Sequence, residues 1–102
     1  MAKLIALYKH PENVAEFDAY YYGNHVPIAK KVPGLRRYEV SKGPVSTLQG
    51  ASDFHLVALL TFDSVAAIHS ALASAEGQAT AADLGNFASA GVDLLVFDSK
   101  EI

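Results

Sequence analysis

The alternation of hydrophobic and polar positions along the chain predicts four strands and two helical regions. Short runs rich in β-branched and aromatic residues, bounded by turn residues, are typical of strands. Such runs occupy residues 3–9, 35–42, 53–62 and 92–98. Between them, apolar residues recur every three or four positions, which indicates helices. The order βαββαβ is the ferredoxin-like arrangement of an α+β protein. We expect residues 1–102 to form one such domain around an antiparallel four-stranded sheet.

The first helical region is expected to consist of two pieces. Asn13 stands three residues before Glu16, the spacing of a capping box at a helix start. The apolar face of this helix would consist of Val14, Phe17, Tyr21 and the adjacent Tyr20. Gly23-Asn24 is expected to interrupt it, and Pro27 suits the first turn of a shorter helix. His25 would then lie at or near a helix start, where the local positive field keeps an imidazole neutral.

The second helical region is also expected to be divided. Asp63 or Ser64 would cap a helix, and Ser74 or Ala75 would begin the next. The residues expected to face inward are Val65, Ala66, Ile68 and Leu72 in the first piece, and Ala79, Ala82, Leu84 and Phe87 in the second. Gly91 is expected to end the region.

The predicted sheet is apolar on both faces. One face of strand 53–62 would carry Phe54, Leu56, Ala58, Leu60 and Phe62, and the other His55, Val57, Leu59 and Thr61. A sheet with one face in water alternates between apolar and polar residues, and this one does not. Burying roughly 500 Å² of the second face would contribute about 12 kcal/mol before association costs. We therefore expect a homodimer that encloses a shared barrel; the alternative is a monomer whose own loops cover that face.

Composition and charge exclude several classes of function. The formal net charge is -3, with 8 basic and 11 acidic side chains, which disfavours nucleic acid as a partner. Without cysteine the chain has no disulfides, thiolate catalysis or iron–sulfur clusters. No spacing typical of a metal site or of a nucleotide-binding loop occurs, so we expect neither a metal nor a cofactor. With no stretch long enough to span a bilayer and no secretory signal, a cytoplasmic location away from membranes is expected.

Histidines, tyrosines and arginines are the candidates for chemistry. His25 is the preferred acid–base group, and capping or packing against Tyr21 is its structural alternative. His55 would face the barrel interior as a base, or lie at the strand end, half in water. Arg37 would bind a carboxylate or an enolate in the cavity, and its alternatives are a dimer salt bridge and a solvated position. The tyrosines considered for lining a cavity are Tyr8, Tyr21, Tyr22 and Tyr38.

The run from Phe17 to Tyr38 resembles the signature of the EthD family, which is named for ethyl tert-butyl ether degradation. The shared pattern is an aromatic pair, a histidine three or four residues on, a proline, then Pro-Gly-Leu and a strand. The resemblance implies a dimeric α/β barrel, in a superfamily that includes isomerases, cyclases or dehydratases, cofactor-free monooxygenases and haem-binding members. It also implies that His25 is the family's histidine, with Tyr21 or Tyr22 as its aromatic partner.

The resulting hypothesis is a small catabolic or accessory enzyme that acts on a compact hydrophobic carbonyl or aromatic compound. His25 would be the general acid/base, Tyr21 would orient the substrate and Arg37 would stabilise developing negative charge. Substrate contacts are expected from Tyr8, Tyr22, Tyr38 and His55. The alternatives are a non-catalytic ligand-binding or helper protein for an oxygenase system, a haem-binding protein, and a purely structural dimer.

Overall fold

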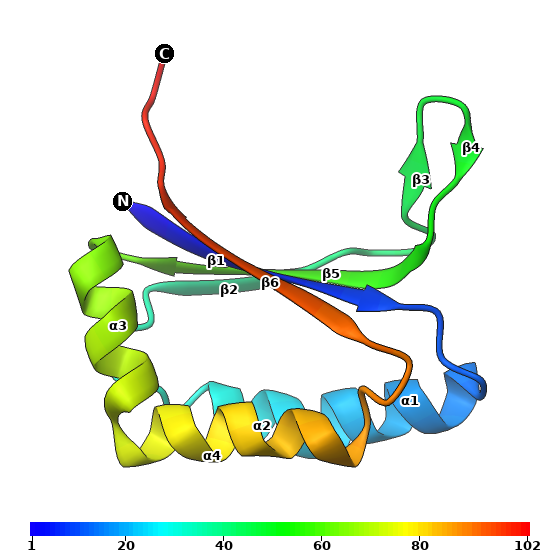
Figure 1. Ribbon diagram of the computed structural model, residues 1–102, viewed down its shortest axis with the longest axis horizontal. Coiled ribbons are helices and arrows are strands. Elements are labelled where there is room, and N and C mark those ends of the chain that lie inside the picture. Colours follow the sequence, from blue (N-terminus) through cyan, green and yellow to red (C-terminus); the bar gives the residue numbers. More distant parts are fainter.

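The computed structural model describes residues 1–102 and has one large sheet with all its helices on one side (Figure 1). The sheet is antiparallel with strand order β2-β5-β1-β6. Its strands are β1 (Ala2–Lys9), β2 (Arg37–Val40), β5 (Phe54–Phe62) and β6 (Val92–Asp98). The first and third predicted strands are therefore central and the other two lie at the edges. The predicted ferredoxin-like α+β fold is confirmed.

The first helical region is continuous, contrary to the predicted break at Gly23-Asn24. Helix α1 (Val14–Tyr20) runs into a π-helical segment η1 (Tyr21–His25) and then into α2 (Val26–Ala29). The N–H of Val26 bonds to the carbonyl of Tyr21, five residues back, so one widened turn accommodates the glycine. His25 thus lies inside a helical segment and not at a free helix start, and the argument from a positive helix end was wrong.

The second helical region is divided as predicted, but its inward faces differ. Ser64 caps α3 (Val65–Ala73), and Ser74 caps α4 (Ala75–Asp83), which continues into a short 3₁₀ turn, η2 (Leu84–Asn86). The buried residues are Ile68 and Ala71 in α3, and Gly77 and Asp83 in α4. Four residues predicted to face inward, Ala66, Leu72, Ala79 and Ala82, are exposed. Alanines occur on all sides of these two helices, so the spacing of apolar residues did not show which side faces the core.

Two helices approach each other closely at Gly77. A β-carbon at this position would lie 2.7 Å from the Cα of Leu72 and would collide with the carbonyl oxygen of Ala71. The first turn of α4 therefore has room only for glycine at position 77, where it meets the end of α3. From this contact α4 runs under the sheet, antiparallel to the first helical region (Figure 1).

A β-bulge changes the face of two residues at the start of β5. Tyr8 pairs with Leu56, but Lys9 pairs with Phe54, which leaves His55 as an extra, unpaired residue. Cross-strand partners share a face, so Phe54 lies with Lys9 on the side away from the helices. His55 turns instead towards α1, where it bonds to Asp18. The predicted faces of Phe54 and His55 were therefore wrong, whereas Leu56, Ala58, Leu60 and Phe62 face the core as predicted.

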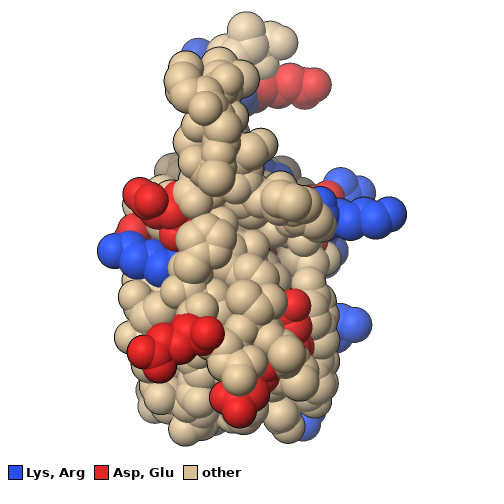
Figure 2. Space-filling model, turned by 90° about the vertical axis from the view of Figure 1, so that its right-hand side faces the viewer, with Lys and Arg blue, Asp and Glu red and all other residues tan.

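The opposite face of the sheet has no helix over it. Its apolar side chains, placed there by strand register, are Ile5, Leu7, Val57, Leu59, Leu95 and Phe97. A small hairpin, β3 (Ser46–Thr47) and β4 (Gly50–Ala51), projects on this side, and so does the C-terminal segment (Figure 1). The hairpin carries no charged side chain and appears as an uncharged projection in Figure 2. No helix of the structure has the length and apolar character needed to cross a membrane.

Substituting Gly77 tests the close approach of the two helices. Gly77→Ala should lower the free energy of unfolding by about 1–3 kcal/mol, because the added methyl group must push backbone apart. Gly85→Ala is the matched control, since a β-carbon there meets nothing within 4 Å. Urea unfolding monitored by circular dichroism measures both. Equal stability of the two variants would contradict a close approach of α3 and α4 at Gly77.

Candidate functional site

A small apolar cavity lies between the helices and the sheet. Its volume is ≈ 130 Å³, and 12 of its 14 lining residues are hydrophobic. An engineered apolar cavity of about 150 Å³ binds benzene, so this space suits a molecule with one ring. Leu72 of α3 and Leu94 and Val96 of β6 line it and are partly exposed, which places its mouth at this edge of the sheet. Among the lining residues are three of the predicted site residues, Tyr8, His25 and Tyr38.

A buried carboxylate orients His25. The Nδ1 atom of His25 lies 2.8 Å from Oδ2 of Asp83, and the two side chains are only 4% and 6% exposed. Asp83 also accepts hydrogen bonds from the hydroxyl of Tyr20 at 2.6 Å and from Nδ2 of Asn86 at 2.9 Å. Burial by itself would raise the pKa of Asp83, but these hydrogen bonds, with that from His25, outweigh it and hold the pKa below its usual value.

The second ring nitrogen of His25 faces the cavity. Because ionised Asp83 can only accept, Nδ1 of His25 carries a proton, and in the neutral imidazole Nε2 has the free lone pair. Every fully buried side-chain nitrogen or oxygen in the structure has a hydrogen-bond partner. Nε2 of His25 has none, so this atom is not fully buried. His25 is one of the lining residues of the cavity, so Nε2 is the nitrogen available to a molecule bound there. An imidazole oriented by a carboxylate with its other nitrogen free is the arrangement of a general base.

Three tyrosines surround the same space. The hydroxyls of Tyr21 and Tyr38 are 2.6 Å apart. Tyr8 is 2% exposed and its hydroxyl has no partner, so by the same reasoning it opens to the cavity. Burial raises the pKa of all three phenols above the usual value. They are therefore neutral hydrogen-bond donors at physiological pH and not bases.

The π-helical turn is what brings these groups together. In an α-helix, residues four apart drift by about 40° around the axis, so a stripe of every fourth residue rotates away from the core. The widened turn offsets this drift, and the stripe of Phe17, Tyr21, His25 and Ala29 stays buried. Phe87 closes the cluster from the other helical region, with its ring centroid 4.7 Å from that of His25.

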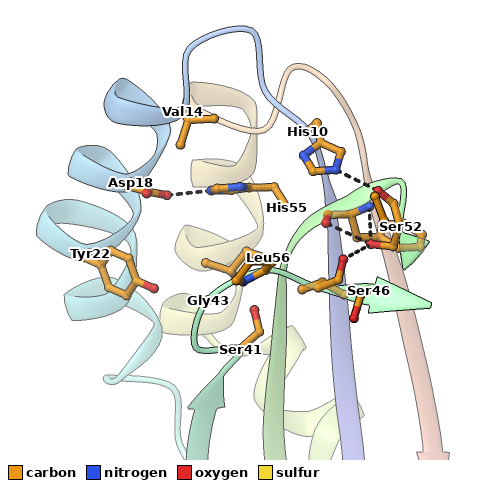
Figure 3. A pocket seen from close by; sticks show the side chains of 14 residues that line it. His10, Val14, Asp18, Tyr22, Ser41, Gly43, Ser46, Ser52, His55 and Leu56 are labelled. Atoms are coloured by element: carbon orange, nitrogen blue, oxygen red, sulfur yellow. Dashed lines mark hydrogen bonds and ion pairs between the residues drawn. The ribbon is translucent and has the colours of Figure 1, made fainter. Parts of the chain in front are cut away.

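Two further predicted residues, Tyr22 and His55, lie in a different place. They line an open groove of ≈ 490 Å³ at the end of the sheet, between α1 and the base of the hairpin (Figure 3). There Nε2 of His55 is 2.8 Å from Oδ1 of Asp18. The groove and the cavity share no lining residue, and neither Tyr22 nor His55 lines the cavity that His25 lines.

Arg37 is not brought together with either group. It pairs with Thr61 and is exposed on the sheet face that no helix covers, whereas His25 lies under the opposite face. The adjacent Arg36 forms an exposed ion pair with Asp63. Within one chain, no arginine therefore reaches the cavity. No group of three His, Asp or Glu side chains converges closely enough to hold a metal ion.

The residue that sequence reasoning missed is Asp83, together with its partners Tyr20 and Asn86. One signal was available: Asp83 is the only acidic residue between Glu76 and Asp93, in an alanine-rich segment. Acidic residues are almost never fully buried unless they are paired. However, spacing cannot show that this aspartate meets His25, because 58 residues separate the two.

The arrangement of strands and helices defines the class of protein. An antiparallel four-stranded sheet with helices on one face is a ferredoxin-like α+β fold, which a protein from Bacteroides fragilis shares. The family of EthD domains matches residues 9–91. The chain therefore belongs to the EthD domain family, as the motif from Phe17 to Tyr38 predicts.

Relatives with similar sequences support this membership. An uncharacterized 11.0 kDa protein of the thcB-thcC intergenic region of Rhodococcus erythropolis is 37% identical over 103 residues, covering 100% of this chain and 98% of that protein. The crystal structure of an EthD family protein from Bacillus halodurans C-125 is 34% identical, with a TM-score of 0.90, covering 98% of this chain and 99% of that one.

More distant structures share the fold alone. SnoaB, a cofactor-independent oxygenase from Streptomyces nogalater, has a TM-score of 0.65 at 17% identity, covering 99% of this chain and 93% of its own. A dimeric protein with a ferredoxin-like fold from Bacteroides fragilis has a TM-score of 0.65 at 14% identity, covering 96% and 95%. Similar folds thus occur in an oxygenase and in a protein described as dimeric.

The low pKa of Asp83 predicts a pH-dependent stability. A carboxyl whose pKa is lower in the folded than in the unfolded state stabilises the fold above about pH 4, and this contribution is lost as the pH falls through the folded value. Asp83→Asn should cost about 2 kcal/mol at neutral pH and should reduce the loss of stability on acidification.

Asp53→Asn is the control, because Asp53 is exposed and makes no side-chain hydrogen bond. Urea unfolding at neutral and acidic pH measures both variants. If Asp83→Asn were as stable as the unsubstituted protein at neutral pH and lost the same stability in acid, the buried pair would have no energetic role.

Proposed function

We propose that this protein is a small enzyme that binds a compact hydrophobic carbonyl or aromatic compound in the interior cavity and moves a proton with His25. The observation that carries the proposal is the imidazole itself: Asp83 holds one nitrogen, and the other opens into an otherwise apolar space. A base in such surroundings reacts with little competition from water. The cytoplasmic location expected from the sequence stays a prediction.

The groups around the cavity suit proton abstraction next to a carbonyl. Nε2 of His25 would take a proton from the α-carbon, leaving an enolate and an imidazolium that ionised Asp83 stabilises. The hydroxyl of Tyr8 would donate a hydrogen bond to the enolate oxygen, where negative charge develops. Return of the proton to a different atom completes an isomerisation with no change in oxidation state. The electron-rich enolate is also the species that a cofactor-independent oxygenation would require.

These roles change part of the initial hypothesis. Tyr8 replaces Tyr21 as the tyrosine that contacts the substrate, because the hydroxyl of Tyr21 already bonds to that of Tyr38. The enolate is stabilised by a phenol and not by Arg37, which lies on the other face of the sheet. Tyr21 becomes a positioning residue that fixes Tyr38 beside the cavity.

The rival function is a binding protein without catalysis. Its support is the cavity lining, which is apolar apart from a few groups and would hold a one-ring molecule without reacting with it. The two functions differ in one measurable respect. A binding protein would bind the ligand without exchanging its protons, whereas an acid–base enzyme must exchange them.

Deuterium exchange at the α-carbon of phenylacetone tests the proposed proton transfer. This one-ring ketone should exchange faster with the protein than in buffer, and His25→Gln should lower that rate by about 10²-fold or more. His69→Gln is the matched control, because His69 is exposed on α3. NMR measures the exchange, and ligand-observed NMR measures binding. Binding without acceleration, or unchanged exchange in His25→Gln, would favour the binding protein.

We also propose that two copies of the chain pair through the sheet face that no helix covers. Six large apolar residues share that face, a concentration that monomers rarely expose. The uncharged hairpin and the C-terminal segment project on the same side and would flank a partner seated there.

Neighbouring residues on β6 provide a matched test of this pairing. Leu95 is 49% exposed and lies on the face without helices, whereas Leu94 is 51% exposed and lies on the helix side. Leu95→Asp should convert the dimer to a monomer, because it buries a charge in the interface, and Leu94→Asp should leave the dimer intact. Analytical ultracentrifugation at micromolar concentration measures both. A monomeric unsubstituted protein would refute the pairing.

A further inference from the structure

A second histidine–carboxylate pair lies outside the proposed active site. His55 and Asp18 face each other in the groove at the end of the sheet, with 2.8 Å between Nε2 and Oδ1 (Figure 3). The side chain of His55 is 18% exposed and that of Asp18 is 43% exposed. The pair is therefore in contact with water at one side, unlike the buried pair of His25 and Asp83.

The backbone departs from regular sheet geometry to place His55 there. In a regular strand His55 would point away from the helices, but the bulge opposite Tyr8 and Lys9 turns it towards α1. The bulge leaves His55 without a cross-strand partner. Bulges are over-represented next to active sites because they re-aim a side chain. Phe17 also holds the imidazole, with its ring edge-on to His55 at a centroid distance of 5.2 Å.

The far wall of the groove is held by its own hydrogen bonds. The hydroxyl of Ser52 donates to the carbonyl of Val45 at 2.6 Å and accepts from the N–H of Phe54 at 3.1 Å. Nε2 of His10 donates to the carbonyl of Ser52 at 2.9 Å. These contacts tie the base of the hairpin to the ends of β1 and β5. The groove is therefore preformed, as most small-molecule sites are.

Several polar atoms in the groove remain free to bind a ligand. With Nε2 of His55 donating to Asp18, Nδ1 has a lone pair and no partner. The hydroxyl of Tyr22 has no partner and points into the groove (Figure 3). Ser41 Oγ accepts from the N–H of Val57, which leaves its hydrogen to donate. Apolar surface beside these groups comes from Val14, Phe54 and Leu56.

We propose that this groove is a second ligand site, and that it binds a one-ring phenol through His55. The phenol O–H would donate to Nδ1 of His55, the hydroxyl of Tyr22 would donate to the phenol oxygen, and the ring would lie on the apolar wall. When the proton transfers, the phenol O–H bond breaks and an N–H bond forms on Nδ1. The products are a phenolate and an imidazolium paired with Asp18, with no change in oxidation state.

The groove is independent of the interior cavity. The ring of Phe17 stands between them, edge-on to His55 on one side and stacked on Tyr21 at 5.9 Å on the other. A ligand in the groove therefore has no access to Nε2 of His25. The proposal goes beyond the proposed function, and each can fail without the other.

Titration with p-nitrophenol tests the second site, because only its ionised form absorbs near the visible range. In buffer acidic enough to keep the free probe mostly protonated, the protein should raise the ionised fraction in a saturable manner. His55→Gln should abolish this absorbance change, since glutamine still bonds to Asp18 but takes no proton. Tyr22→Phe should weaken binding by about tenfold, the effect of one hydrogen bond to a charged oxygen.

His25→Gln is the control that separates the two sites, and it should leave the p-nitrophenol signal unchanged. Asp18→Asn guards against a folding defect in the His55 variant, and it should reduce the signal because the imidazolium loses its partner. A signal that His25→Gln removes and His55→Gln retains would place the probe in the interior cavity and overturn the proposal. So would an absorbance change that does not saturate.

Discussion

One buried carboxylate holds the two helical regions of this protein together. Asp83, at the end of α4, accepts hydrogen bonds from Tyr20 and His25 of the first helical region and from Asn86 of its own. An isolated ion would cost several kcal/mol to bury, but three donors compensate for its lost water. The same bonds fix the imidazole of His25 against the cavity. A single side chain therefore both joins the helical regions and orients the imidazole of His25.

Two local irregularities determine where the histidines point. The π-helical turn keeps His25 on the buried stripe that begins at Phe17, and the bulge in β5 turns His55 towards Asp18. A regular helix or strand would have placed each imidazole elsewhere. Each histidine then faces an aspartate from another segment, and Phe17 separates the two pairs. The molecule thus has two histidine–aspartate pairs in different surroundings. The pair of His25 and Asp83 is buried, and the pair of His55 and Asp18 is partly exposed to solvent.

The prediction from sequence succeeded where a repeating period carries the information. Strand 53–62 differs from β5 (Phe54–Phe62) by one residue, and the motif from Phe17 to Tyr38 identified the family correctly. The prediction failed where the hydrophobic repeat is interrupted, or where it does not distinguish one side of a helix from the other. Gly23-Asn24 was interpreted as an interruption because glycine usually ends helices. In the structure both residues lie within the π-helical segment η1, and the helix continues. In the alanine-rich α4 the inward residues were Gly77 and Asp83, which no hydrophobic pattern distinguishes.

The sequence by itself determined the order of elements, the strands at the centre and edges, and the apolar character of both sheet faces, because these follow from short-range periodicity and general rules of chain topology. Only the tertiary structure decided which groups meet. The contacts of His25 with Asp83 and of His55 with Asp18 join residues 58 and 37 positions apart. Such pairs depend on how helices pack and where a strand bulges, and those features arise from contacts between distant segments.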